Sequence, residues 1–233
     1  MAAPINTGRL LHSTVVLPKG ANLASVIFLH GSGDTGSGVR GWIETLLRRD
    51  LEVKNTKLIF PTAPLRPYSP MNGALSNVWF DRKKIAPTAD ECIESVDIAC
   101  EEVGKILREE ADSGISKNKI VIGGFSMGGA LAYHLAYRFH RDIAGVFSLS
   151  SFINKDSIIY QEVKQVKNGL PPLFAAHGGK DPLVLFDWGV DTVKALESLG
   201  VSTVFHEFPR LHHELGVQEL RLLEEWLSKI LNV

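Results

Sequence analysis

The residues best suited to chemistry lie in the pentapeptide Gly124-Phe125-Ser126-Met127-Gly128, which matches the pattern G-x-S-x-G. The pentapeptide stands between a β-branched run and a stretch with helical spacing, which is the strand-turn-helix context of a nucleophile elbow. Such a serine sits on a strained turn, so that side chains two positions away would meet neighbouring backbone, and glycine is needed there. The pattern predicts Ser126 as a nucleophile and the Met127 N–H as an oxyanion donor.

An acid and a base should follow this serine along the chain, in that order. Asp181 comes shortly after a predicted strand at 172–176. We therefore predict Asp181 as the acid that accepts the imidazole N–H of the base and fixes its tautomer. His177, on the strand that leads to Asp181, is interpreted as a structural residue near the site. Asp187 and Asp191 fall in the next predicted helix and are interpreted as surface carboxylates.

The base must be one of the three histidines that follow Asp181, which are His206, His212 and His213. His206 lies inside the last predicted strand. His212 and His213 lie in the loop between that strand and the final predicted helix, where an α/β-hydrolase carries its base. Their spacing does not separate these two neighbours.

A second glycine-rich turn, His30-Gly31-Ser32-Gly33-Asp34-Thr35-Gly36, follows the predicted strand at 25–29. In an α/β-hydrolase this turn supplies the other oxyanion N–H, and we assign it to the backbone of Ser32. The turn does not match G-x-G-x-x-G, and no Gly-Lys-Ser/Thr follows, so a nucleotide loop is disfavoured. The sequence has no H-E-x-x-H and no cysteine pair at zinc spacing, which disfavours a metal. No cofactor is expected.

The elements that must position these residues alternate along the chain. Short apolar, β-branched runs predict seven strands, at 11–17, 25–29, 57–60, 119–122, 144–149, 172–176 and 202–208. Stretches with helical spacing predict five helices, at 42–51, 89–111, 129–139, 185–199 and 214–231. The alternation predicts an α/β-hydrolase type of α/β fold, with a mostly parallel central sheet and helices on both faces. A length of 233 residues fits a single domain over 1–233.

The segment 61–87 breaks this alternation, because it holds five of the eleven prolines and the aromatic pair Trp79-Phe80. Proline fixes φ and removes a donor, so we expect a long, stiff, irregular loop here. Trp79 and Phe80 have two interpretations of equal weight. They bind substrate as part of a wall of the site, or they pin the loop to the core.

Composition and charge exclude several other classes of protein. A formal net charge of −1 gives no broad positive field for nucleic acid or an anionic membrane. No apolar run approaches the roughly 18 residues that span a bilayer, and the N-terminus lacks a signal pattern. Cys92 and Cys100 fall eight positions apart in one predicted helix, which is too far for a disulfide. We expect a cytosolic protein with reduced thiols and at most transient membrane contact.

Several motifs follow one another from about the first strand to the last helix: 28–36, Pro61-Thr62-Ala63-Pro64, Trp79-Phe80-Asp81, 124–129, Leu149-Ser150-Ser151, His177-Gly178 with Asp181, and His213-Glu214. In these motifs and their order, the chain resembles the acyl-protein thioesterase and lysophospholipase family. The resemblance implies that His213, which precedes Glu214, is the catalytic histidine. It also implies backbone oxyanion donors at Ser32 and Met127, a cytosolic setting, and cleavage of S-palmitoyl cysteine thioesters or related acyl esters without a cofactor.

The chain departs from the family pattern at both oxyanion positions, since typical acyl-protein thioesterases have Leu in place of Ser32 and Gln in place of Met127. These departures leave the length of the acyl chain open. We therefore expect a palmitoyl-protein thioesterase acting on S-acylated proteins, with a short-chain carboxylesterase for small acyl esters or a lysophospholipase as alternatives. Peptidase activity is disfavoured because an amide asks more of the general acid than a thioester does. An inactive binding module is disfavoured because serine, aspartate and histidine are all present.

Overall fold

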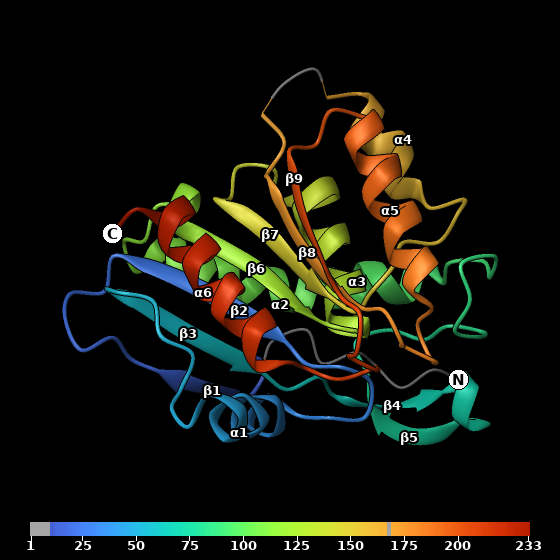
Figure 1. Cartoon of the computed structure of the whole chain (residues 1–233), viewed down its shortest axis with the longest axis horizontal. Coiled ribbons are helices and arrows are strands. Elements are labelled where there is room, and N and C mark those ends of the chain that lie inside the picture. Colours follow the sequence, from blue (N-terminus) through green and yellow to red (C-terminus); the bar gives the residue numbers. More distant parts are fainter. Residues whose placement is uncertain (1–9, 167–168) are drawn as a thin grey trace.

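A seven-stranded sheet forms the centre of the computed structural model, which describes residues 10–166 and 169–233 (Figure 1). The strand order is β1-β3-β2-β6-β7-β8-β9, with β1 antiparallel to β3 and all other neighbours parallel. All seven predicted strands are present, and the four strands β2, β6, β7 and β8 are buried along their whole length, as their apolar sequences require. The strands are β1 (Ser13–Val16), β2 (Ala24–Leu29), β3 (Thr56–Pro61), β6 (Ile120–Phe125), β7 (Gly145–Leu149), β8 (Leu173–Gly178) and β9 (Thr203–Phe208).

Helices cover both faces of the sheet, as the alternation predicts. One hydrophobic core lies under α1 (Gly36–Leu47) and α6 (Val217–Leu231), which contact each other; in Figure 1, α6 crosses the front of the sheet and α1 lies at its lower edge. A second core lies on the opposite face, and helices of the other set bury their apolar sides in it. That set comprises α2 (Ile93–Asp112), α3 (Met127–His134), α4 (Ile158–Lys164) and α5 (Phe186–Ser198).

The strand order reverses between β2 and β6, and this reversal positions the site. Leu29 at the end of β2 is paired in register with Gly124 near the end of β6. The loops that follow these two strands therefore leave the sheet side by side at its carboxyl edge. This is the place where open α/β sheets bind their ligands.

The prediction of an irregular loop over 61–87 is wrong in part. The strands β4 (Leu65–Tyr68) and β5 (Ala74–Asn77) pair as an antiparallel hairpin and are joined through the 3₁₀ helix Ser69–Met71. Pro67 hides the strand signal, yet a two-stranded ribbon tolerates proline at a position whose N–H faces solvent. Tyr68 and Ser76 are buried, so the ribbon rests on the body of the protein with one face.

Two helix predictions also need correction. α1 begins at Gly36, six residues before the predicted start, because the Thr35 side chain accepts from the Gly38 N–H as an N-cap. A Cβ at Gly36 would collide with the carbonyl oxygen of Phe60, so glycine here permits close packing rather than a turn. The short helix α4 has no predicted counterpart; Ser157 caps its start by accepting from Ile159 N–H.

The remaining helices match their predictions except at their ends. α2 begins at Ile93, so Cys92 precedes the helix that holds Cys100, and both cysteines are free. The predicted helix 129–139 is an α-helix that continues as the π-helical turn Leu135–Phe139. Among the described residues, no helix combines the length and the apolar character needed to cross a bilayer.

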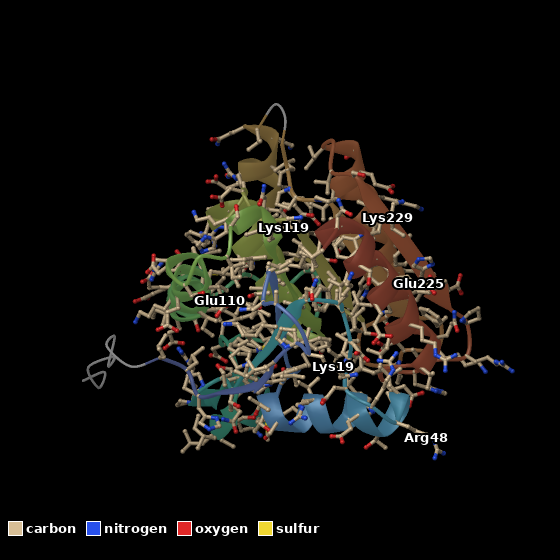
Figure 2. All side chains as sticks on the ribbon, turned by 90° about the vertical axis from the view of Figure 1, so that its left-hand side faces the viewer. Lys19, Arg48, Glu110, Lys119, Glu225 and Lys229 are labelled. Carbon is tan, nitrogen blue, oxygen red and sulfur yellow. The ribbon has the colours of Figure 1, made fainter. Side chains whose placement is uncertain are left out.

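Charged side chains connect helices to the amino-terminal edge of the sheet, opposite the site. Glu110 of α2 is 6% exposed and accepts from Ser25 Oγ at 2.5 Å, and Lys57 Nζ lies 2.6 Å from its other oxygen. Lys119 donates to the Leu231 carbonyl at the end of α6. Figure 2 shows Glu110 and Lys119 among the side chains of this half of the molecule. These contacts join α2 to the beginnings of β2 and β3, and the end of α6 to the turn that precedes β6.

The carboxyl group of Glu219 is fully buried at the start of α6, where Oε2 accepts from the Gly216 N–H at 3.0 Å. Burial raises its pKa from 4.5 to about 8, although the Gly216 bond acts in the opposite direction. The native state therefore keeps a proton that the unfolded state loses between these two values. The free energy of unfolding should fall as the pH rises through this window and level off above pH 8.

We expect Glu219→Gln to remove this decline, which is worth on the order of 5 kcal/mol across the window. Urea unfolding of both proteins at several pH values measures it, because the difference between them cancels every other titrating group. Glu225→Gln is the matched control, since Glu225 is exposed on the same helix (Figure 2). A constant difference between Glu219→Gln and the parent from pH 5 to pH 9 would contradict the assignment.

Candidate active site

Ser126 occupies a sharp turn between β6 and α3, with φ 54° and ψ −119°. A Cβ at Gly124 or at Gly128 would collide with the carbonyl oxygen of Leu29. The two glycines thus let the turn lie directly against the end of β2, as the G-x-S-x-G pattern predicts. A positive φ strains a residue with a side chain, and such strain is typical of functional positions.

The structure brings the three predicted triad residues together in one hydrogen-bonded chain. His213 Nε2 lies 3.0 Å from Ser126 Oγ, and His213 Nδ1 lies 2.7 Å from Asp181 Oδ2. The Asp181 side chain is completely buried and that of His213 is 15% exposed. Because a carboxylate only accepts, Nδ1 carries the hydrogen and Nε2 is free to take the serine proton. The His213 ring also packs on Phe125, with the ring centres 4.8 Å apart.

The carboxylate of Asp181 is held on both oxygens. Oδ1 accepts from the N–H groups of Leu183 and Val184, at 2.9 and 2.8 Å. Burial by itself would raise the pKa of Asp181, but the nearby N–H groups of His177, His213 and Val184 outweigh burial and hold this pKa well below its usual range. Asp181 therefore stays ionised throughout the neutral range, as an orienting acid must.

The structure separates the two neighbouring histidines that spacing leaves equivalent. The His212 side chain is 60% exposed, and its Nδ1 lies 3.8 Å from Glu214 Oε1. His206 lies in β9 with its ring against Phe174, 5.4 Å between centres. Of the three candidates only His213 touches Ser126.

The two residues predicted to supply oxyanion donors lie side by side. Ser32 follows β2 and Met127 is the first residue of α3, and Ser32 Oγ donates to Met127 Sδ at 3.6 Å. The backbone around Ser32 is fixed, because Gly33 N–H donates to the Asn77 carbonyl of β5 at 2.9 Å. The role of their two N–H groups stays a prediction, and it fits a site between the two loops.

Trp79 and Phe80 are both buried, at 0% and 6% exposure. Trp79 Nε1 donates to the His30 carbonyl at 2.8 Å, so the indole supports the loop that carries Ser32. This placement agrees with the interpretation that the pair pins its segment to the core. Their substrate-binding role stays a prediction.

His30 supports the loop that carries Ser32, and the sequence reasoning missed this role. Its Nδ1 donates to the Gly31 carbonyl at 2.7 Å, and its Nε2 accepts from Ala63 N–H at 3.0 Å. Burial lowers the pKa of His30, against the opposing effect of the Gly31 bond, so the ring stays neutral and keeps both bonds. The position of a histidine between a buried strand and a glycine turn indicates a structural role of this kind, because a buried imidazole needs hydrogen-bond partners.

Among the described residues, no group of three or more His, Cys, Asp or Glu side chains is placed so that it could hold a metal ion. Ser126, His213 and Asp181 have the arrangement expected of a nucleophile, a base and an orienting acid. On a doubly wound sheet with the serine on an elbow, they define the class of α/β-hydrolase serine enzymes.

Comparison with known proteins identifies the family to which the chain belongs. A model of the Phospholipase/Carboxylesterase family matches residues 10–231, and the chain belongs to this family. It is similar to lysophospholipase-like protein 1 of Mus musculus, with 53% identity over 213 residues that cover 91% of this chain and 89% of the mouse protein. The predicted fold, the resemblance to acyl-protein thioesterases and lysophospholipases, and the assignment as a serine hydrolase are confirmed.

The chain is also similar to two acyl-protein thioesterases. Acyl-protein thioesterase 1 of Debaryomyces hansenii is 32% identical over 217 residues, 89% of this chain and 91% of the yeast protein. The crystal structure of Zea mays acyl-protein thioesterase 2 superposes with a TM-score of 0.78 at 28% identity, over 94% of this chain and 99% of the maize chain.

Proposed function

We propose that the chain hydrolyses acyl thioesters and esters with Ser126 as nucleophile, His213 as general base and Asp181 as orienting acid. The observation that carries this proposal is the unbroken hydrogen-bonded chain from Ser126 Oγ through the His213 ring to Asp181. The names of the relatives point to S-acylated proteins as the leading substrate class and to lysophospholipids as an alternative.

The geometry supports a two-step acyl transfer. His213 Nε2 takes the proton of Ser126 Oγ as the oxygen attacks the acyl carbonyl carbon, and the oxyanion accepts from the N–H groups of Ser32 and Met127. His213 returns the proton to the leaving thiol or alcohol. Water then attacks the acyl-serine with His213 as base again, which releases the acid and restores the enzyme. The residues complete this cycle without a cofactor.

A thiol with a pKa of roughly 8.5 leaves more easily than an alcohol. We therefore expect an S-acyl cysteine peptide to be cleaved with a higher kcat than the serine oxyester peptide of the same acyl group. The measurement is release of free acid from the matched pair. Ser126→Ala gives the background rate. Equal rates with a burst of leaving group would indicate that deacylation limits both reactions.

The length of the acyl chain is the finer part of the proposal. Each methylene buried in a site contributes about 0.8 kcal/mol, or about fourfold in kcat/KM. For a palmitoyl-protein thioesterase we expect kcat/KM to rise from acetyl to palmitoyl substrates. A maximum at short chains would contradict palmitoyl specificity and favour a short-chain carboxylesterase.

We also propose a cytosolic setting with at most transient membrane contact. The net charge of −1 and the two free cysteines support it.

A further inference from the structure

A second buried histidine stands behind the acid of the triad. His177 lies in β8, four residues before Asp181, and its side chain is 1% exposed. Its Nε2 lies 2.8 Å from the carbonyl oxygen of Val184. A carbonyl oxygen only accepts, so Nε2 carries the hydrogen and donates it.

Val184 connects this histidine to the carboxylate. Its N–H donates to Asp181 Oδ1 at 2.8 Å, while its carbonyl accepts from His177. The His177 Nε2 also lies 3.6 Å from Asp181 Oδ2, the oxygen that accepts from His213. That separation is too long for a hydrogen bond but short enough for the N–H dipole to favour the ionised carboxylate. His177 thus contacts both the acid and the turn that grips it.

The His177 ring cannot move freely. A Cβ at Gly189, in the first turns of α5, would collide with its Nδ1. The Phe186 ring meets the imidazole edge-on, with centres 5.9 Å apart and planes at 86°. The imidazole is therefore held between β8 and the start of α5, and it transmits that rigidity to the turn 181–184.

We infer that His177 is a positioning residue of the reaction, acting through Asp181. The inference rests on the proposed function, because Asp181 matters to chemistry only as the partner of His213. A carboxylate that turns or shifts no longer holds the imidazole in line with Ser126 Oγ. Misplacement of a catalytic group by about 1 Å can cost on the order of 100-fold in rate.

The test compares two substitutions that differ in hydrogen bonding. His177→Phe keeps a ring of similar shape and removes the donor, whereas His177→Gln keeps an N–H that can reach Val184. We expect His177→Phe to lower kcat by roughly 10- to 100-fold with KM unchanged. We expect His177→Gln to restore most of this loss. His206→Phe, the same change on the neighbouring strand β9 at the position paired with Ala176, serves as the matched control and should leave kcat unchanged.

A second measurement shows whether the effect passes through the acid. Asp181→Asn alone should lower kcat by about 10⁴-fold, because the amide no longer fixes the imidazole tautomer. In that background His177→Phe should cause no further loss, measured with an activated short-chain ester. Independent losses that multiply in the double variant would overturn the inference, since a general effect on packing would behave in that way.

Gly189→Ala gives a route that leaves His177 itself unchanged. The added methyl group displaces the ring, so we expect kcat to fall in Gly189→Ala as in His177→Phe. Gly189→Ala therefore tests the inference even if His177→Phe folds poorly. Full kcat in both His177→Phe and Gly189→Ala, with Ser126→Ala inactive, would overturn this inference alone. Activity that survives in Ser126→Ala would instead overturn the proposed function.

Discussion

Replacement of Ser126 by alanine is expected to lower kcat/KM by roughly 10⁴- to 10⁶-fold, because removal of the nucleophile leaves only binding and oxyanion stabilisation. The hydrogen-bonded chain ends at Ser126 Oγ, and His213 Nε2 has no proton to take once that oxygen is gone. Hydrolysis of an activated acyl ester measures the loss. Covalent labelling by a fluorophosphonate probe gives an independent readout, which Ser126→Ala should abolish.

The strained turn makes a second substitution informative. Ser126 has φ 54°, a region that L-residues adopt at a cost of about 1–3 kcal/mol and glycine adopts freely. Ser126→Gly should therefore be as inactive as Ser126→Ala but more stable by an amount in this range. Urea unfolding of the two variants measures the difference. A less stable glycine variant would show that the turn is not strained.

Ser150 provides the matched control for the labelling experiment. It is a buried serine at the end of the neighbouring strand β7, also with positive φ, at 50°, and its Oγ has no hydrogen-bond partner among the described residues. Ser150→Ala should keep both labelling and turnover. If the parent protein reacted with the probe at a residue other than Ser126, the assignment of the nucleophile would be wrong.

Local patterns predict the fold and the sharp turn at Ser126 well, because both depend on neighbours in sequence. The elbow needs glycine at 124 and 128, since the turn lies directly on the Leu29 carbonyl, and that requirement is written in five consecutive letters. The strands β2, β6, β7 and β8 are buried on both faces, so their continuous apolar runs identify them.

The hairpin β4–β5 and the support of the oxyanion loop depend on contacts that periodicity does not reveal. Pro67 interrupts the β signal, and the ribbon is recognisable only from the pairing of 65–68 with 74–77. From the sequence, Trp79 could bind substrate or pin its loop to the core. Its hydrogen bond to the His30 carbonyl shows how it packs. Periodicity contains no information about such partners, so His30 is not identified by it.

The orientation of the His212-His213 pair is also a tertiary property. The carbonyl groups of Leu211 and His212 pack so closely on Gly178 that any side chain there would collide with them. The Lys180 N–H donates to the Leu211 carbonyl at 3.0 Å and ties the loop to the turn that carries Asp181. The backbone thereby directs the ring of His213 toward Asp181 and leaves that of His212 in solvent.

This pair yields the second prediction of large effect. His213→Gln should lower kcat by roughly 10⁴- to 10⁶-fold, because an amide cannot take the Ser126 proton at neutral pH. His212→Gln makes the same chemical change one residue away, on a side chain that is 60% exposed, and should leave kcat unchanged. Steady-state hydrolysis of one activated ester by both variants is the measurement, with urea unfolding to verify that each is folded.

The contrast between the two variants decides the assignment more firmly than either loss alone. A general weakening of the loop 209–216 would lower the activity of both proteins together, since they share its backbone. A large loss in His212→Gln, or a residual activity near that of the parent in His213→Gln, would contradict the triad. If only His213→Gln is inactive, the base is identified by function as well as by its 3.0 Å contact with Ser126 Oγ.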